Sequence, residues 1–376
     1  MTQPTHPNRI TPYPQQVPQW PVAQQTGWGT SGQPPRKPPS DIGKILSAII
    51  GSVLSVLALL AIIGMLTDEK PLTPSVNPTT NITFPSRSTI STPTTATITD
   101  NSGYVNDDYT LTSPGMNAGL GRPEPTTWAE ATQLLTDNSL YHNITMPIPV
   151  RCELSQMSVM SADAVELKTH FDELTACLMR AWDPTLQKAG FYAVRPIINI
   201  YSAEIDSPCG ELPVENAAFC SANEQIYYSA KLPTMLPAGT LEANMVVESI
   251  ISHEFGHAVQ NRTGILSSAN AWINHYNSQN DKLMENQYSR WLELQADCFA
   301  GEFLKSVSHS VGLTEADSDA IALMFYSIGD DVLTGEPNYD GNHGHGQNRV
   351  NWLAQGFNQE NLGHCNTFIA AAADTK

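Results

Sequence analysis

The chain has 376 residues, of which 41% are hydrophobic and 15% charged, and its formal net charge at pH 7 is -18. Beyond Lys44, 15 Lys and Arg stand against 36 Asp and Glu. Because phosphate binding needs a basic surface, this acidity argues against a nucleic-acid partner. The composition leaves the substrate and the oligomeric state open.

Two segments of the N-terminal third lack the apolar patterning of a folded core. Residues 1–43 are rich in Pro and Gln, so we expect a disordered arm. Residues 67–125 are rich in Thr, Ser and Pro, which is typical of an extended linker. Neither segment is expected to form part of a globular domain.

Between them, residues 44–66 contain an uncharged run from Ile45 to Leu66 that is long enough for one transmembrane helix. A cleaved signal peptide fits less well, because the preceding segment is long and no small-residue cleavage site follows. Basic residues precede the run, and Asp68 and Glu69 follow it. This asymmetry predicts a single-pass protein of the cell membrane with a cytoplasmic N-terminus and an extracytoplasmic domain.

Regular patterning begins near Trp128, and we expect residues 126–376 to form one α+β domain. The periodicity and the boundary residues predict five helices and two strands. In chain order these are a helix at Trp128–Leu135, a helix within Ser161–Trp182, strands at Pro196–Ser202 and Gln225–Ser229, and helices at Ala243–Gln260, Ser289–Val307 and Arg349–Gly356.

All six cysteines follow the apolar run, and an even number in an exported domain predicts three disulfides. A zinc–thiolate cluster is less consistent with the sequence, because no CxxC is present. Cys209 and Cys220 bracket a short segment between the two predicted strands, so we pair them first. The remaining pairs are then Cys298–Cys365 and Cys152–Cys177, although the sequence alone allows other connectivities.

The segment His253-Glu254-Phe255-Gly256-His257 carries the clearest chemical signal. On a helix, His253 and His257 project from one face, so both imidazoles can bind a single metal ion. Glu254 lies beside that site, where a general base can take a proton from an activated water. The alternative is a pair of ordinary core histidines, and a chance match to this motif is expected in roughly one such chain in a hundred.

A catalytic zinc needs a third protein ligand and one open position. Glu293 and Asp297 lie four residues apart on one face of a predicted helix, where two acids would repel each other unless a cation offsets them. We therefore assign Glu293 as the third ligand. Asp297 is assigned to accept a hydrogen bond from a ligating histidine. The alternative is an acidic pair on a solvated surface.

The stretch HEFGHAVQ, followed 36 residues later by ELQADCFAG, resembles the bacterial putative neutral zinc metallopeptidases. It is also similar, more distantly, to zincins whose third ligand is a glutamate. Weaker family-like stretches (SPCG, AFC, IYY, HGQNRV and CNTF) extend the resemblance over roughly residues 150–370, while the loop between Cys209 and Cys220 departs from the family pattern. The resemblance implies a zincin-like α+β fold, one Zn²⁺, Glu293 as a zinc ligand and Asp297 as the residue that orients a histidine.

The predicted function is hydrolysis of peptide bonds in a peptide or protein substrate by zinc-activated water, with Glu254 as general base and later as proton donor. The charge that develops on the carbonyl oxygen needs a second donor besides the metal. The resemblance to zincins implies that the strand at 225–229 is an edge that pairs with an extended substrate. The sequence does not choose among the candidate donors His343, His345, Arg349, Tyr227 and Tyr228. The alternative for His345 and Arg349 is that they cap or brace a helix.

Two other classes fit part of the sequence. A catalytically inactive zinc-binding envelope or scaffold protein would keep the ligands, but it would have no use for Glu254 beside them. A deformylase-like hydrolase would use a cysteine as the third ligand, which requires a cysteine outside any disulfide. Glu254→Gln separates the first alternative from a peptidase, and the state of the cysteines separates the second.

Overall fold

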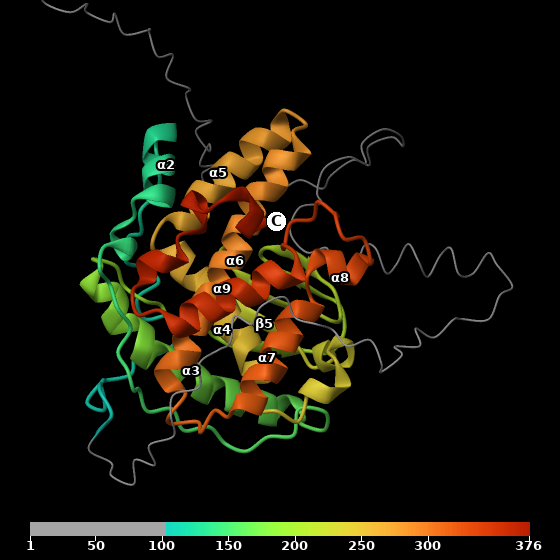
Figure 1. The fold of residues 1–376 in the computed structure, drawn as a ribbon. Coiled ribbons are helices and arrows are strands. Elements are labelled where there is room, and N and C mark those ends of the chain that lie inside the picture. The colour runs from blue at the N-terminus through green and yellow to red at the C-terminus, as the bar shows by residue number, and fades with distance from the viewer. Residues whose placement is uncertain (1–102) are drawn as a thin grey trace, which may run out of the picture.

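The computed structural model describes residues 103–376 (Figure 1). The predicted transmembrane run from Ile45 to Leu66 lies outside these residues, as do the predicted arm and most of the predicted linker. Within the described range, no helix combines the length and the apolar character needed to cross a membrane.

The described chain folds into a mixed α+β domain in which helices predominate. The strands are β1 (Ile198–Tyr201), β2 (Ile205–Ser207), β3 (Gly210–Leu212), β4 (Ala217–Cys220) and β5 (Gln225–Ser229). The α-helices are α2 (Trp128–Thr136), α3 (Ala164–Lys188), α4 (Val246–Arg262), α5 (Ile265–Ser278), α6 (Lys282–Val307), α7 (Glu315–Ser327), α8 (Asp330–Thr334) and α9 (Gly346–Asn358).

Side-chain caps fix where several of these helices begin. Thr127 accepts a hydrogen bond from the backbone of Glu130, so α2 begins at Trp128, the residue where the predicted helix begins. Asp163 and Glu166 form a reciprocal capping box that starts α3. Asp281 accepts from the backbone of Met284 and starts α6, so this helix begins seven residues before the predicted Ser289.

The main sheet has the strand order β1-β5-β4. Strand β5 runs parallel to β1, with Ile198 opposite Ile226, and antiparallel to β4, with Ala218 opposite Tyr227. The prediction that residues 225–229 form an edge strand is therefore wrong, because β5 is paired on both sides. Within this sheet β4 is an edge, and β2 and β3 form a separate hairpin.

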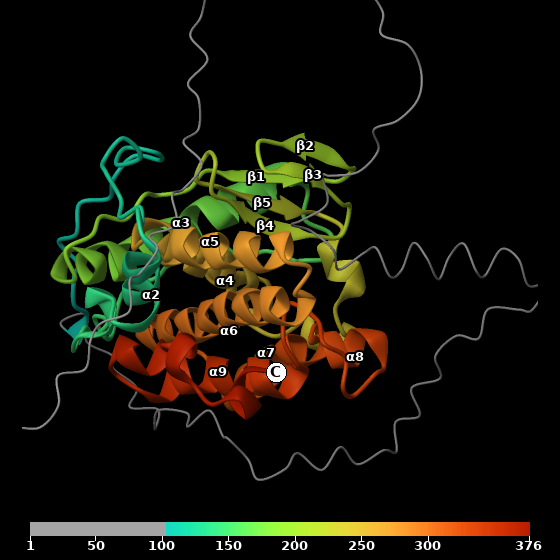
Figure 2. The same cartoon turned by 90° about the horizontal axis from the view of Figure 1, so that it is seen from above.

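Helices α4, α5, α6, α7 and α9 lie in successive rows on one side of the strands (Figure 2). Helices α4 and α5 follow the strands, then α6, then α9 and α7. Every residue of α4 except His257 is buried, so its many polar side chains must find their partners inside the fold. The centre of the domain thus holds α4 between the sheet and α6.

Candidate metal centre

Helices α4 and α6 approach each other closely at a glycine. A side chain at Gly256 would place its Cβ only 3.0 Å from Cα of Ala296, so the helices can pack at this distance because Gly256 has none. Ala296 lies between Glu293 and Asp297 on α6. The crossing therefore brings the histidine face of α4 against the acidic face of α6.

Three predicted ligands meet at this crossing. Nε2 of His253 lies 3.2 Å from Oε2 of Glu293, and Nε2 of His257 lies 3.5 Å from Oε1 of the same carboxylate. One ligand atom from each of the three residues lies within 4.8 Å of the other two. The set of two imidazole nitrogens and one carboxylate oxygen fits a catalytic zinc site, since it leaves one position for water or substrate.

The other ring nitrogen of His253 is held by a buried carboxylate. Nδ1 of His253 donates to Oδ1 of Asp297 at 2.7 Å, and Asp297 is completely buried. Arg349 on α9 donates to both oxygens of Asp297, at 2.8 and 3.0 Å. This chain of contacts directs Nε2 of His253 toward Glu293, which is the orientation that metal binding requires.

His257 is held in the same way by a neutral partner. Its Nδ1 donates to Oε1 of Gln260 at 2.8 Å, while Gln260 donates to the carbonyl oxygen of Leu292 at 2.8 Å. Gln260 is a further residue of the site, and its position three residues after His257 places it on the same face of the helix.

Acidic groups dominate the electrostatics of the cluster. Burial acts to raise the pKa of Glu293, yet His257 and His253 hold that pKa well below its usual range. Burial acts to lower the pKa of His253, but Asp297 and Glu293 raise it to about 10. The pKa of His257 is also raised, against burial, by the charge of Glu293. The site therefore favours positive charge, whether as protons or as a metal ion.

Glu254 lies beside the ligands and is almost fully buried. Its Oε2 accepts a hydrogen bond of 2.7 Å from the backbone N–H of Phe219 on the edge strand β4. One carboxylate oxygen is thereby fixed, and the orientation of the other follows from it. The contact also connects the edge strand of the sheet to the candidate metal site formed by His253, His257 and Glu293.

Two candidate substrate contacts on β5 lie in the core. Tyr228 has no exposed surface and packs against Phe171, so its predicted contact with the substrate is wrong. Tyr227 is 8% exposed, and its hydroxyl accepts a hydrogen bond from Asn223. The two side chains project from opposite faces of the sheet, and each face is covered, since Tyr228 packs against Phe171 and Tyr227 against Tyr201 and Leu212.

Two further candidates lie near the start of α9. Arg349 is 4% exposed and bound to Asp297, so of its two possible roles the structure favours bracing over contact with a substrate. Nε2 of His345 donates to the carbonyl oxygen of Tyr339 at 2.9 Å. His345 is also the residue that precedes the first turn of α9.

All six cysteines form disulfides, joining the pairs expected from the sequence: Cys152–Cys177, Cys209–Cys220 and Cys298–Cys365. None of them can serve as a metal ligand, which excludes the deformylase-like alternative. Two of the disulfides lie close to the cluster in sequence, since Cys220 follows Phe219 and Cys298 follows Asp297.

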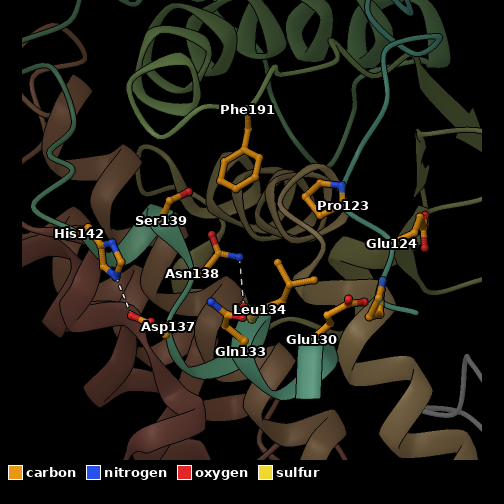
Figure 3. A pocket seen from close by; sticks show the side chains of 11 residues that line it. Pro123, Glu124, Glu130, Gln133, Leu134, Asp137, Asn138, Ser139, His142 and Phe191 are labelled. Atoms are coloured by element: carbon orange, nitrogen blue, oxygen red, sulfur yellow. Dashed lines mark hydrogen bonds and ion pairs between the residues drawn. The ribbon is translucent and has the colours of Figure 1, made fainter. Parts of the chain in front are cut away.

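A hollow of about 510 Å³ lies elsewhere, around α2 (Figure 3). The buried Asn138 beside it is fully used within the fold, because its amide donates to the carbonyl oxygens of Leu134 and Thr263. None of the residues of the metal cluster lines this hollow. The chemistry proposed below does not involve it.

The fold and the site together define a class, that of α+β proteins with the metal-ligand arrangement of HExxH metallopeptidases. The chain belongs to the family described as "Putative neutral zinc metallopeptidase", whose family model matches residues 134–368. The resemblance inferred from the sequence is thus confirmed.

Two relatives show how far the similarity extends. Over 195 residues the chain is 28% identical to the uncharacterized protein YpfJ of Escherichia coli (strain K12). The aligned residues make up 50% of this chain and 66% of YpfJ. Over 209 residues it is 29% identical to the uncharacterized protein Rv2575 of Mycobacterium tuberculosis (strain H37Rv), covering 50% of this chain and 67% of that protein. The chain thus spans just under two thirds of YpfJ. No solved structure matches it.

Proposed function

We propose that this protein is a zinc-dependent peptidase that hydrolyses internal peptide bonds. In this proposal His253, His257 and Glu293 are the ligands of one zinc ion, and Glu254 is the general base. The observation that carries the proposal is the convergence of the three ligand atoms within 4.8 Å, with a buried carboxylate on the adjoining turn of α4. When bound, zinc supplies a Lewis acid that lowers the pKa of a water molecule and polarises the scissile carbonyl.

The residues of the chain supply the proton transfers. Phe219 N–H holds Oε2 of Glu254, which leaves Oε1 to take a proton from the attacking water. The same carboxyl group then delivers that proton to the nitrogen of the leaving amine. Asp297 and Gln260 keep both imidazoles in the tautomer that directs Nε2 toward Glu293.

A purely structural zinc site is less consistent with this geometry. Structural sites are usually closed by four protein ligands, whereas the described residues bring three together here. In such a site Glu254 would also lower the stability of the fold, because a buried acid needs compensating contacts. The arrangement favours catalysis over the inactive alternative.

The edge strand supports an extended peptide as the substrate. Within its sheet β4 pairs on one side only, with β5, and Phe219 on β4 contacts Glu254. An extended peptide can add to such an edge through main-chain hydrogen bonds, which would place a peptide bond beside the proposed base. We propose this edge as the substrate-binding strand.

The three disulfides support a location in an oxidising compartment. We therefore also propose that the described domain works outside the cytoplasm. The membrane anchor predicted from the Ile45–Leu66 run is part of the same proposal.

The test compares the full chain with its Glu254→Gln variant, each loaded with zinc. Removal of the base should lower kcat/KM for peptide-library substrates by about 10²–10⁴-fold while zinc content stays the same. The control is Glu242→Gln, which changes an exposed acid just before α4 and should cleave like the unmodified chain. Equal cleavage by the Glu254→Gln protein would remove the proposed base.

A further inference from the structure

The loop between α8 and α9 runs along α6 beside the proposed ligand Glu293. At one end, Arg290 of α6 donates to the carbonyl oxygen of Gly341 at 2.6 Å. At the other, Gly344 packs so closely on Leu294 that an added Cβ would lie 3.1 Å from its side chain. Because Arg290 and Leu294 lie on either side of Glu293 in α6, the loop passes next to the candidate metal site.

Asp330, the first residue of α8, fixes the conformation of this loop. Its Oδ2 accepts the backbone N–H groups of His343 and Gly344, at 2.7 and 2.9 Å. Its Oδ1 lies 3.3 Å from Nδ1 of His343. Gly341 packs directly on the same carboxylate, with no room for a side chain. The buried carboxylate of Asp330 therefore fixes both the backbone conformation and the ring orientation of His343.

The ring of His343 is a half-buried donor with one nitrogen free. Its side chain is 21% exposed, and Nε2 has no hydrogen-bond partner among residues 103–376. The charged groups that face the ring are Asp330, Glu293 and Arg349. Burial acts to lower the pKa of His343, but the contact with Asp330 and the charge of Glu293 raise it above its usual value. The ring thus keeps a proton on each nitrogen to higher pH than a free histidine does.

We propose that His343 is a further catalytic residue, whose Nε2–H donates a hydrogen bond to the oxygen of the scissile carbonyl. This inference rests on the proposed function. Of the other candidate donors, Arg349 binds Asp297, and both Tyr227 and Tyr228 of β5 are buried. His345 directs Nε2 to the carbonyl oxygen of Tyr339. His343 combines a ring nitrogen that has no partner among the described residues with a ring that faces Glu293.

The step balances without net transfer of a proton from His343. The water oxygen forms a bond to the carbonyl carbon, Glu254 takes a water proton, and the electron pair of the C=O double bond moves to the oxygen. His343 stabilises that oxygen by hydrogen bonding. The pair returns when the C–N bond breaks, and the amine leaves with the proton from Glu254. In this scheme Asp330 is a positioning residue, because it acts only through His343.

The test uses zinc-loaded full chain and the variants His343→Asn and His343→Gln. Asn cannot reach the position of Nε2, so kcat should fall by about 10²–10³-fold with KM and zinc content unchanged. Gln places an amide donor near that position and should recover part of the loss. Binding of a phosphinic peptide, which mimics the charged oxygen, should weaken by a similar factor in His343→Asn when measured by calorimetry.

His345→Asn serves as the matched control, because it changes a histidine in the same loop whose ring binds Tyr339. It should keep kcat and the affinity for the phosphinic peptide. Full kcat in His343→Asn, or loss of zinc from it, would overturn the role of His343 as a donor. If Glu254→Gln remains inactive in the same assay, that result would refute the His343 inference alone and leave the proposed function standing.

Discussion

Glu302 on α6 is a carboxylic acid sealed in the core. It has no exposed surface, and neither of its side-chain oxygens finds a hydrogen-bond partner within the described part of the chain. Burial raises its pKa to about 8, with a lowering contribution from Lys305 and a raising one from Glu360. At neutral pH the side chain is therefore largely protonated, which avoids the cost of a buried, unpaired charge.

Glu302 should make the stability of the domain depend on pH. Its pKa in the folded chain lies above the value of about 4.3 expected after unfolding, so unfolding releases a proton between these values. The free energy of unfolding should then fall as pH rises from about 4.5 to 8, by on the order of 4 kcal/mol in total. Glu302→Gln should flatten this slope in urea unfolding at pH 5, 6.5 and 8.

The exposed Glu360→Gln serves as the comparison, because it removes a nearby acid without touching the buried one. It should leave most of the pH slope in place. If Glu302→Gln shows the same slope as the unmodified chain, the dependence comes from other groups.

At the site, local spacing identified some residues and could not identify the roles of others. His253, His257 and Glu254 lie within five residues, so their geometry follows from the helix itself. Glu293 and Asp297 could be identified because two acids on one helix face repel each other unless a cation offsets their charge. The bracing role of Arg349 depends on how α9 packs on α6, which no short-range pattern encodes.

Among the elements, five helices were predicted from the sequence, and α5, α7 and α8 were not. Helix α5 contains many Asn and Ser residues, which favour caps and turns over helix interiors. It forms because Ile265, Ala269 and Ile273 are buried on one face, so tertiary packing decides. The strands β2, β3 and β4 have three or four residues each, too few to show an alternating pattern.

Helix α7 is a different case, because its sequence does carry a start signal. Thr314 and Asp317 form a reciprocal capping box in the structure, and this pattern can be read from the chain directly. Helix α7 could therefore have been predicted from this signal, unlike α5.

The packing of α9 on α6 depends on two glycines that face each other's helix. A Cβ at Gly356 would collide with the backbone of Cys298 and Glu302, and one at Gly301 with the backbone of Leu353. Gly356→Ala should therefore lower the free energy of unfolding by about 1–3 kcal/mol, although alanine is the better helix former. Because α9 carries Arg349, the displacement should also weaken zinc binding, measurable with a competing chelator.

Gly239→Ala is the matched control, since nothing lies within 4 Å of a Cβ at that position. It should leave the free energy of unfolding within about 0.5 kcal/mol of the unmodified chain. A Gly356→Ala protein as stable as this control would show that α9 moves away from α6 at no cost.

At the scale of the whole molecule, the disulfides divide into local and long-range links. Cys209–Cys220 joins residues 11 apart and holds the β2–β3 hairpin to the edge strand. Cys298–Cys365 joins residues 67 apart and ties the middle of α6 to the segment that follows α9. Both cysteines of the long-range pair are completely buried. The two links should contribute to stability by different amounts.

Replacing both members of each pair by alanine tests this difference. In the chain-entropy account, the longer loop of Cys298–Cys365 contributes about 4 kcal/mol and the shorter loop of Cys209–Cys220 about 3 kcal/mol. Loss of the sulfurs adds a larger cavity cost to the first variant, because both of its cysteines are completely buried whereas Cys209 of the second pair is only partly buried. Guanidinium unfolding should therefore show a clearly larger loss for Cys298→Ala with Cys365→Ala than for Cys209→Ala with Cys220→Ala. Equal losses, or the reverse order, would contradict the argument from loop length and burial.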